Sequence, residues 1–405
     1  ARNDGTNPNY GVYRFEDHQD ANGDWVLDGV ILPEWLDADQ TMKPADTDWQ
    51  KEISRTGLSQ TVNVAFSMGS EKGRTLLALD YFDNKGTTKE NKWNRTTLRI
   101  NSDYMLLNNR LRVGEDISLM KFFFTGINLL SQTRNIQPIV PVRTADGRGW
   151  GGPVMGMSDR INPVLEIMRN KDNHSHDIGI MGSIFADLEI LKNLKFKSTL
   201  GLDGGGNWRR QMRRTYQAGF MSERVARLEQ FSSYGYTWTW NNVLNYDLNF
   251  GKNSIGVLAG QEAIYSESAD MSGARDGFAI EDPEYMYLSV GDGNVQNSGG
   301  ASDWALNSYF GKVTYNYGNR YLATAIVRYD GSSRFGKNNR YASFPSLSAG
   351  WVVSEESFMK DVQFVSFLKL RYGWGKTGNQ AASVYATWGQ YQAFYGDWSG
   401  GNRQG

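Results

Sequence analysis

Hydrophobic and polar positions alternate with period two along one long stretch of the chain. One face carries Tyr234, Tyr236, Trp238, Trp240, Leu244, Tyr246, Leu248 and Phe250, and the other carries Thr237, Thr239, Asn241, Val243, Asn245, Asp247 and Asn249. This pattern predicts a β-strand with one apolar and one polar face. Soluble strands usually have about 5–6 residues, whereas a tilted strand needs about 9–11 residues to cross a bilayer. The length therefore favours a transmembrane strand.

Further segments show the same alternation with varying clarity. They lie near 62–68, 77–81, 93–105, 110–122, 178–189, 195–203, 254–265, 309–317, 321–330, 343–353 and 368–374. With 234–250 they make twelve predicted strands, each with a polar face.

The predicted connections between these strands alternate in length. Short turns are expected at 69–73, 106–110, 189–194, 251–253 and 318–320, and longer connections at 83–92, 123–177, 204–233, 265–303 and 330–342. Outer-membrane barrels combine short periplasmic turns with long extracellular loops. We therefore predict an all-β chain that forms part of a large antiparallel transmembrane β-barrel, with 354–366 as a longer periplasmic connection.

The predicted organisation has two regions. Residues 1–58 are expected to form an extracellular loop region with a short helix near 48–56, and residues 59–405 the barrel strands and loops. Thr47 and Gln50 fit a capping box that opens the helix, and Gly57 fits a glycine that ends it.

Composition agrees with a barrel and excludes several other classes. The mean hydropathy is −0.55, and no run of about 18 apolar residues indicates a membrane-spanning helix. The net charge of −1, from 43 basic and 44 acidic residues, gives no electrostatic footprint for nucleic acid. Cysteine is absent, so the chain has neither disulfides nor a cysteine-ligated metal site.

Local motifs give no support for catalytic, cofactor or metal sites. Asp20–Asp28 has oxygen ligands at alternate positions, but Trp25 replaces the glycine that a calcium loop needs, so a solvated turn is favoured. His174, His176 and Asp177 lack further ligands at metal-site spacing. Gly151–Gly152 and Gly204–Gly206 are predicted in loops without the strand and helix of a phosphate cradle.

An arginine cluster follows Trp208, in or beside a predicted long loop. Its members are Arg209, Arg210, Arg213 and Arg214. One interpretation is contact with acidic sugars, lipopolysaccharide phosphates or a partner protein, and the other, which we favour, is a solvated strand end.

The polar faces supply candidate cargo-binding residues. We expect six of them to face the lumen: Asn241, Asp247, Lys312, Arg328, Asp330 and Arg371. Their mixed charges suit hydroxyl-rich or zwitterionic cargo. Trp150 and Trp398 are candidate loop aromatics, for stacking on sugar rings or for packing the loops.

Several segments resemble the SusC/RagA family of TonB-dependent outer-membrane transporters, in the family's order. The longest are Arg328–Gly336 and Phe344–Trp351; the others are Thr47–Gly57, Met68–Lys72, Gly201–Asp203, Ser302–Leu306, Ser308–Lys312, Ser354–Met359 and Lys376–Gln380. The resemblance implies a barrel of about 22 strands with a plugged lumen. We therefore expect about half of the wall here, without the plug domain, the TonB box or the closing strands.

The resemblance also implies a function in the outer membrane of a Gram-negative bacterium. It implies TonB-dependent import of oligosaccharides or peptides, with a SusD-like surface lipoprotein as partner and without a cofactor or an enzymatic activity. Two alternatives remain at this point: a passive outer-membrane porin, and a soluble carbohydrate-binding β protein.

Overall fold

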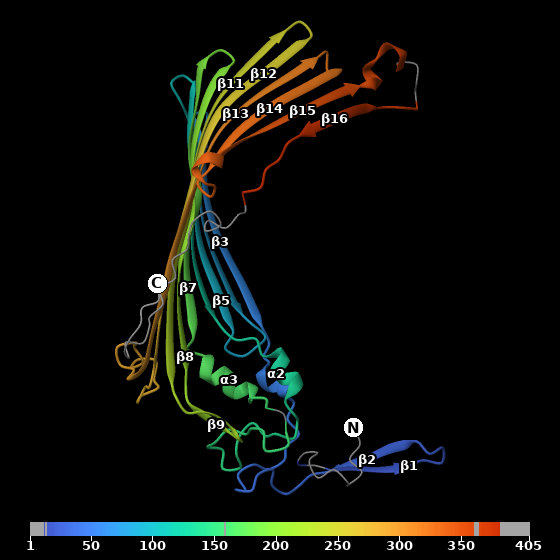
Figure 1. The fold of residues 1–405 in the computed structure, drawn as a ribbon, viewed down its shortest axis with the longest axis vertical. Helices are drawn as coiled ribbons and strands as arrows, with labels where there is room; N and C mark the ends of the chain where they lie inside the picture. The colour runs from blue at the N-terminus through green and yellow to red at the C-terminus, as the bar shows by residue number, and fades with distance from the viewer. Residues whose placement is uncertain (1–11, 13, 158, 360–363, 381–405) are drawn as a thin grey trace, which may run out of the picture.

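The computed structural model describes residue 12 and residues 14–157, 159–359 and 364–380. Its main element is a twelve-stranded antiparallel sheet, with neighbouring strands in chain order (Figure 1). The strands are β3 (Leu58–Ser70), β4 (Gly73–Lys85), β5 (Lys92–Leu106), β6 (Leu111–Thr125), β7 (His174–Leu191), β8 (Leu194–Arg213), β11 (Arg227–Phe250), β12 (Asn253–Asp276), β13 (Gly293–Tyr317), β14 (Tyr321–Ser332), β15 (Tyr341–Val352) and β16 (Lys369–Gly375). The prediction of twelve strands is confirmed.

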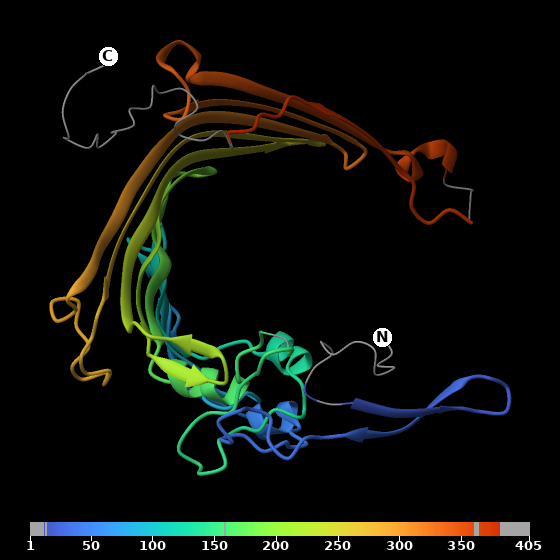
Figure 2. The same cartoon turned by 60° about the horizontal axis from the view of Figure 1, so that its bottom comes forward.

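The sheet curves like part of a barrel wall (Figures 1 and 2). Within the described residues β3 and β16 are its two edge strands, so this wall is open rather than closed. Five short turns join β3–β4, β5–β6, β7–β8, β11–β12 and β13–β14 at one end, which we call the short-turn end. The longer connections lie at the opposite, long-loop end.

Cross-strand register extends the two faces of each strand over the whole sheet. The apolar face carries Val64, Leu79, Leu98, Leu119, Ile180, Leu202, Trp240, Val257, Val313, Val327 and Leu347. The polar face carries Asn63, Asp80, Thr97, Asp116, Ser183, Lys197, Asn241, Glu262, Ser308, Arg328 and Ser346. A sheet with one continuous apolar side is what a bilayer-facing wall requires.

Burial differs between the two faces. On the apolar face of interior strands Trp240 is 47% exposed and Val327 51% exposed, whereas Thr97 and Ser308 on the polar face are 7% and 0% exposed. Side chains converge on the concave side of a curved sheet and spread apart on its convex side. The asymmetry therefore indicates that the polar face is the concave one.

Several strands extend further at the long-loop end than predicted. The connection β8–β11 spans only 214–226, and β12–β13 only 277–292. Gly204–Gly206 therefore lie inside β8 and His174–Asp177 at the start of β7, not in loops as predicted. Beyond the bilayer both faces of a strand contact water, so apolar and polar residues no longer alternate there. The backbone hydrogen bonds between strands nevertheless continue.

Three short helices form a small body at the long-loop end: α1 (Trp49–Ile53), α2 (Leu130–Asn135) and α3 (Pro163–Asn170) (Figure 1). Trp49 packs on Ile136 and Val140, and Ile53 packs on Leu129 and Ile167. No helix in the described ranges is long and apolar enough to cross a membrane.

The predicted capping of the first helix is wrong. The N-cap of α1 is Asp48, whose carboxylate accepts a hydrogen bond from the Lys51 amide at 3.0 Å. The Thr47 hydroxyl instead donates to the Val140 carbonyl at 2.8 Å, so it holds the loop body together. The helix ends at Ile53, where extended Ser54 follows, before Gly57 is reached.

Two small hairpins complete the structure. β1 (Arg14–Gln19) pairs with β2 (Trp25–Ile31) and projects beyond the helical body (Figure 2), and β9 (Tyr216–Ala218) pairs with β10 (Met221–Glu223). In the β1–β2 turn, Asp20 accepts hydrogen bonds from the amides of Asn22 and Asp24 at 2.9 and 2.8 Å. The predicted solvated turn fits these contacts, because the turn's own amides occupy the Asp20 carboxylate.

Candidate functional site

All six predicted lumen residues lie on the polar face of the sheet. Register links Asn241 to Glu262, Glu262 to Ser308, and Ser308 to Asp330. The positions of Asp247, Lys312, Arg328 and Arg371 follow the same register on that face.

Three of the six join one polar network centred on Arg328. Its Nη2 donates to Glu262 Oε1 at 2.6 Å and to Ser308 Oγ at 2.9 Å, and its Nε donates to Asp330 Oδ1 at 2.6 Å. The Asn241 amide donates to the other oxygen of Glu262 at 3.3 Å. The network ties β11, β12, β13 and β14 together, and the one guanidinium of Arg328 is shared between the two carboxylates of Glu262 and Asp330.

The other three lumen residues stay outside this network. Asp247, Lys312 and Arg371 are exposed on the same face, at positions where their charges are available to a solute. The structure therefore divides the predicted set into a structural cluster and a group of exposed charges.

Sequence reasoning missed Glu262 and Ser308. The segment 254–265 alternates poorly, because Gly256, Ala259 and Gly260 interrupt both faces. Without a clear face pattern, nothing in the sequence assigns Glu262 to the polar side.

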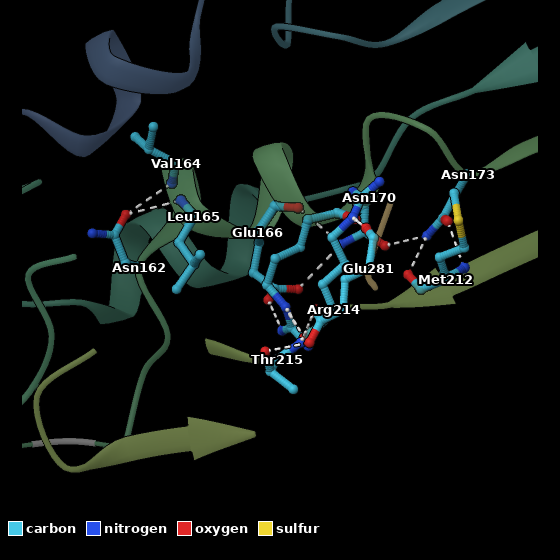
Figure 3. A network of polar contacts seen from close by, with 11 residues as sticks. Asn162, Val164, Leu165, Glu166, Asn170, Asn173, Met212, Arg214, Thr215 and Glu281 are labelled. Atoms are coloured by element: carbon cyan, nitrogen blue, oxygen red, sulfur yellow. Dashed lines mark hydrogen bonds and ion pairs between the residues drawn. The ribbon is translucent and has the colours of Figure 1, made fainter. Parts of the chain in front are cut away.

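Two of the four clustered arginines, Arg210 and Arg214, are not at the solvated strand end that we favoured. Arg214 Nε bonds the Glu281 carbonyl at 3.0 Å (Figure 3). Its Nη2 bonds Asp172 Oδ2 at 2.6 Å, and its Nη1 bonds the Arg169 carbonyl at 3.1 Å. The Arg210 guanidinium donates to the carbonyls of Pro283 and Met286. These two arginines hold α3 and the loop 277–292 against the end of β8.

The remaining two arginines point to the polar face. Strand alternation places Arg209 and Arg213 opposite to Arg210, and Arg213 is 62% exposed. Arg213 lies 3.9 Å from a carboxylate oxygen of Glu229. The cluster thus has one structural and one solvent-facing half.

Of the two loop aromatics, Trp150 packs within the loop body, and Trp398 lies outside the described residues. The Arg143 guanidinium lies over the Trp150 ring, 3.3 Å from its centroid. Trp150 also borders a hollow of about 710 Å³ together with Asp37 and Phe220. Burial raises the pKa of Asp37, but hydrogen bonds from the Thr41 hydroxyl and nearby amides outweigh it and leave that pKa below its usual value.

The glycine pair after Trp150 serves backbone packing. A Cβ on Gly151 would lie 1.8 Å from the Pro141 carbonyl oxygen, and one on Gly152 would lie 2.1 Å from that of Ala218. Only glycine permits such close approach of two backbone segments. Among the described residues no group of three or more His, Asp or Glu is arranged to hold a metal ion.

Comparison with known proteins identifies the family, although no family model matches the chain. The TonB-dependent receptor P3 of Formosa agariphila is 29% identical over 374 residues, which is 87% of this chain and 36% of that protein. The TonB-dependent receptor SusC of Bacteroides thetaiotaomicron is 27% identical over 362 residues, 83% of this chain and 35% of SusC. The chain belongs to the SusC/RagA-like TonB-dependent receptors. It spans about a third of the length of the curated relatives it matches.

The fold agrees with this membership. A structure of the RagAB peptide importer in the open-open state superposes with a TM-score of 0.73 at 23% identity, covering 85% of this chain and 40% of that chain. TonB-dependent receptors are outer-membrane β-barrels, so the predicted localisation is confirmed and the soluble interpretation is excluded. The proteins compared are receptors and an importer, not enzymes.

Proposed function

We propose that the chain provides wall and loops of a TonB-dependent importer for oligosaccharides or peptides. The observation that carries the proposal is the division of the sheet into one apolar and one polar face over all twelve strands. The apolar face contacts lipid, and the polar, concave face lines the lumen through which the cargo moves. Asp247, Lys312 and Arg371 meet the cargo there, while the Arg328 network keeps the wall in shape.

The orientation in the membrane follows from the connections. The short-turn end faces the periplasm and the long-loop end the outside, as in other outer-membrane barrels. The described residues up to 58 and the helical body then lie outside the cell, where Trp150 contacts arriving cargo. The other described residues form barrel strands and their loops.

Two protein partners complete the importer. A SusD-like lipoprotein covers the long-loop end and helps to capture cargo, and TonB acts from the periplasm through other parts of the receptor. The similarity to SusC and to the RagAB peptide importer supports this partnership. The wall itself uses no cofactor and performs no catalysis.

A passive porin is the second candidate, because a lumen lined with mixed charges suits diffusion as well. The two functions differ in their need for energy. We expect uptake of cargo by cells that carry the receptor to stop when TonB is depleted, whereas a porin continues to conduct.

The proposal is tested by deleting the gene and measuring uptake of radiolabelled oligosaccharides and peptides. Loss of uptake of at least one of them, restored by the wild-type gene only in the presence of TonB, supports the importer. Unchanged uptake of all of them contradicts it, and TonB-independent restoration favours the porin.

A further inference from the structure

A hollow of about 510 Å³ lies on the polar face near the long-loop end, between β8, β11, β12 and β13. Its floor is low because Ser272, Ala274 and Ser298, which have short side chains, occupy neighbouring positions on β12 and β13. Longer side chains surround this floor: Arg209, Gln211, Arg227, Glu229, Phe231 and Gln296. We call it the rim hollow.

One wall of the rim hollow is held rigid by Arg227. Its Nε bonds Glu229 Oε1 at 2.7 Å, its Nη1 bonds Asp276 Oδ1 at 2.9 Å, and its Nη2 bonds Gln296 Oε1 at 2.5 Å. All three nitrogens of the guanidinium are engaged, and both carboxylates face a cation. Arg213, 3.9 Å from Glu229, is a second cation beside the two carboxylates, so this wall is a fixed arrangement with little uncompensated charge.

The opposite wall carries a second arginine, whose environment differs from that of Arg227. Arg209 pairs in register with Phe231, and its guanidinium lies 5.3 Å from the centroid of that ring. It is exposed, and no carboxylate in the part of the chain that the structure describes forms an ion pair with it. Asp270 lies one row nearer the short-turn end and is not part of the lining. Arg209 is thus the charge that remains open to a ligand.

The groups around Arg209 fit a sugar better than a peptide. On the far side of Phe231 from β8, the register partner is Ser272, whose small side chain leaves room beside the ring. Gln211, Gln296 and the serine hydroxyls are hydrogen-bonding groups suited to ring hydroxyls. Phe231 is the only large apolar side chain in the lining, so the apolar subsites that peptide side chains would fill are missing there.

We propose that the rim hollow binds a pyranose that bears a carboxylate or a sulfate ester, within an anionic oligosaccharide. The anion pairs with Arg209, whose planar fork suits both groups. The ring packs on Phe231, and its hydroxyls bond Gln211 and the serines. This inference rests on the proposed import function and names the substrate class.

The test is calorimetric titration of the full-length receptor, purified in detergent with its lipoprotein partner. The ligands are tetragalacturonate, a sulfated carrageenan tetrasaccharide, neutral maltotetraose and tetra-alanine. We expect at least one of the two anionic sugars to bind tenfold or more tightly than maltotetraose and tetra-alanine. Equal or weaker binding of both anionic sugars overturns the inference.

Two substitutions locate the site. R209Q removes the charge and is expected to weaken binding of the preferred anionic sugar about tenfold or more, because charge-assisted hydrogen bonds are the strong ones. F231L is expected to weaken binding while leaving the charge preference. R213Q, four residues along the same face, is the matched control and stays within about twofold of wild type. Wild-type affinity in R209Q overturns the inference, and so does an equal loss in R213Q.

Failure here is distinguishable from failure of the proposed function. The titration measures binding without transport. If R209Q binds every ligand as wild type does while TonB-dependent uptake persists, the site is wrong and the importer stands. If Arg209-dependent binding is found and gene deletion changes no uptake, the site stands and the importer fails.

Discussion

Arg328 and Glu262 form an ion pair of 2.6 Å between strands that are not neighbours, because β13 lies between β14 and β12. The contact passes over Ser308, which is fully buried and whose hydroxyl accepts a second hydrogen bond from the same guanidinium nitrogen. A small residue at that position of β13 is what lets the two long side chains meet.

Loss of this pair is expected to destabilise the sheet. Glu262 is 17% exposed and Arg328 34% exposed, so the pair is partly shielded from water. We predict that E262A lowers the free energy of unfolding by about 1.5–3 kcal/mol, the range for hydrogen bonds to charged groups. Urea unfolding of the full-length receptor in detergent, followed by tryptophan fluorescence, measures it. D247A, on the same face and exposed, is the control; equal losses in both variants contradict the prediction.

Strand number and facing were predictable where alternation is strong, and the Arg328 network was only half predictable. Asn241, Arg328 and Asp330 sit on strands whose other face is clearly apolar, so their facing could be read directly. Glu262 follows a stretch rich in glycine and alanine, where neither face is marked. The contact between Arg328 and Glu262 depends on cross-strand register, which no local pattern in the sequence contains.

The contacts of the arginine cluster could not be predicted from the sequence either. Adjacent arginines on a strand point to opposite faces, so Arg209 and Arg210 have different environments despite being neighbours in sequence. Arg210 and Arg214 are used by the loop 277–292, which is distant along the chain. Composition alone could not separate these two from the exposed pair.

Removal of Arg214 is expected to loosen the loop 277–292. Its side chain is 16% exposed and connects α3, Asp172 and the Glu281 carbonyl. We predict that R214A increases cleavage of this loop by chymotrypsin or proteinase K several-fold, because the loop loses its anchor while the barrel stays folded. R213A, at a 62% exposed side chain, should leave the cleavage rate unchanged. Equal rates for R214A and wild type would falsify the anchoring role.

Glu356 is expected to make stability depend on pH at the short-turn end. The Tyr321 hydroxyl donates to it at 2.6 Å and the Trp351 indole at 3.0 Å, and Arg320 lies 3.0 Å away. The hydrogen bond from Tyr321, then that from Trp351, together with the nearby Arg320 charge, outweigh burial and hold the pKa of Glu356 below its usual 4.5. A carboxylate whose folded-state pKa is lowered stabilises the fold above the unfolded-state pKa.

That stabilisation is therefore complete at neutral pH and is lost as the pH falls below about 4.5 through the lower folded-state pKa. We predict that E356Q lowers the melting temperature at pH 7 and that its difference from wild type shrinks toward pH 3. Differential scanning calorimetry of the full-length receptor measures both profiles. E355Q, at the exposed neighbouring position, is the control. A constant difference between E356Q and wild type from pH 7 to pH 3 contradicts this role for the carboxylate.

The assignment of the two faces is tested most directly by cysteine labelling in outer membranes. This chain contains no cysteine, so single substitutions are easily interpreted in a receptor whose other cysteines are removed. W240C and L244C lie on the apolar face, and N241C and N245C lie on the polar face of the same strand. A maleimide confined to the lipid phase is predicted to label the first pair, and a water-soluble maleimide the second. Labelling of N241C and N245C from the lipid, with W240C and L244C reached only from water, would contradict the account.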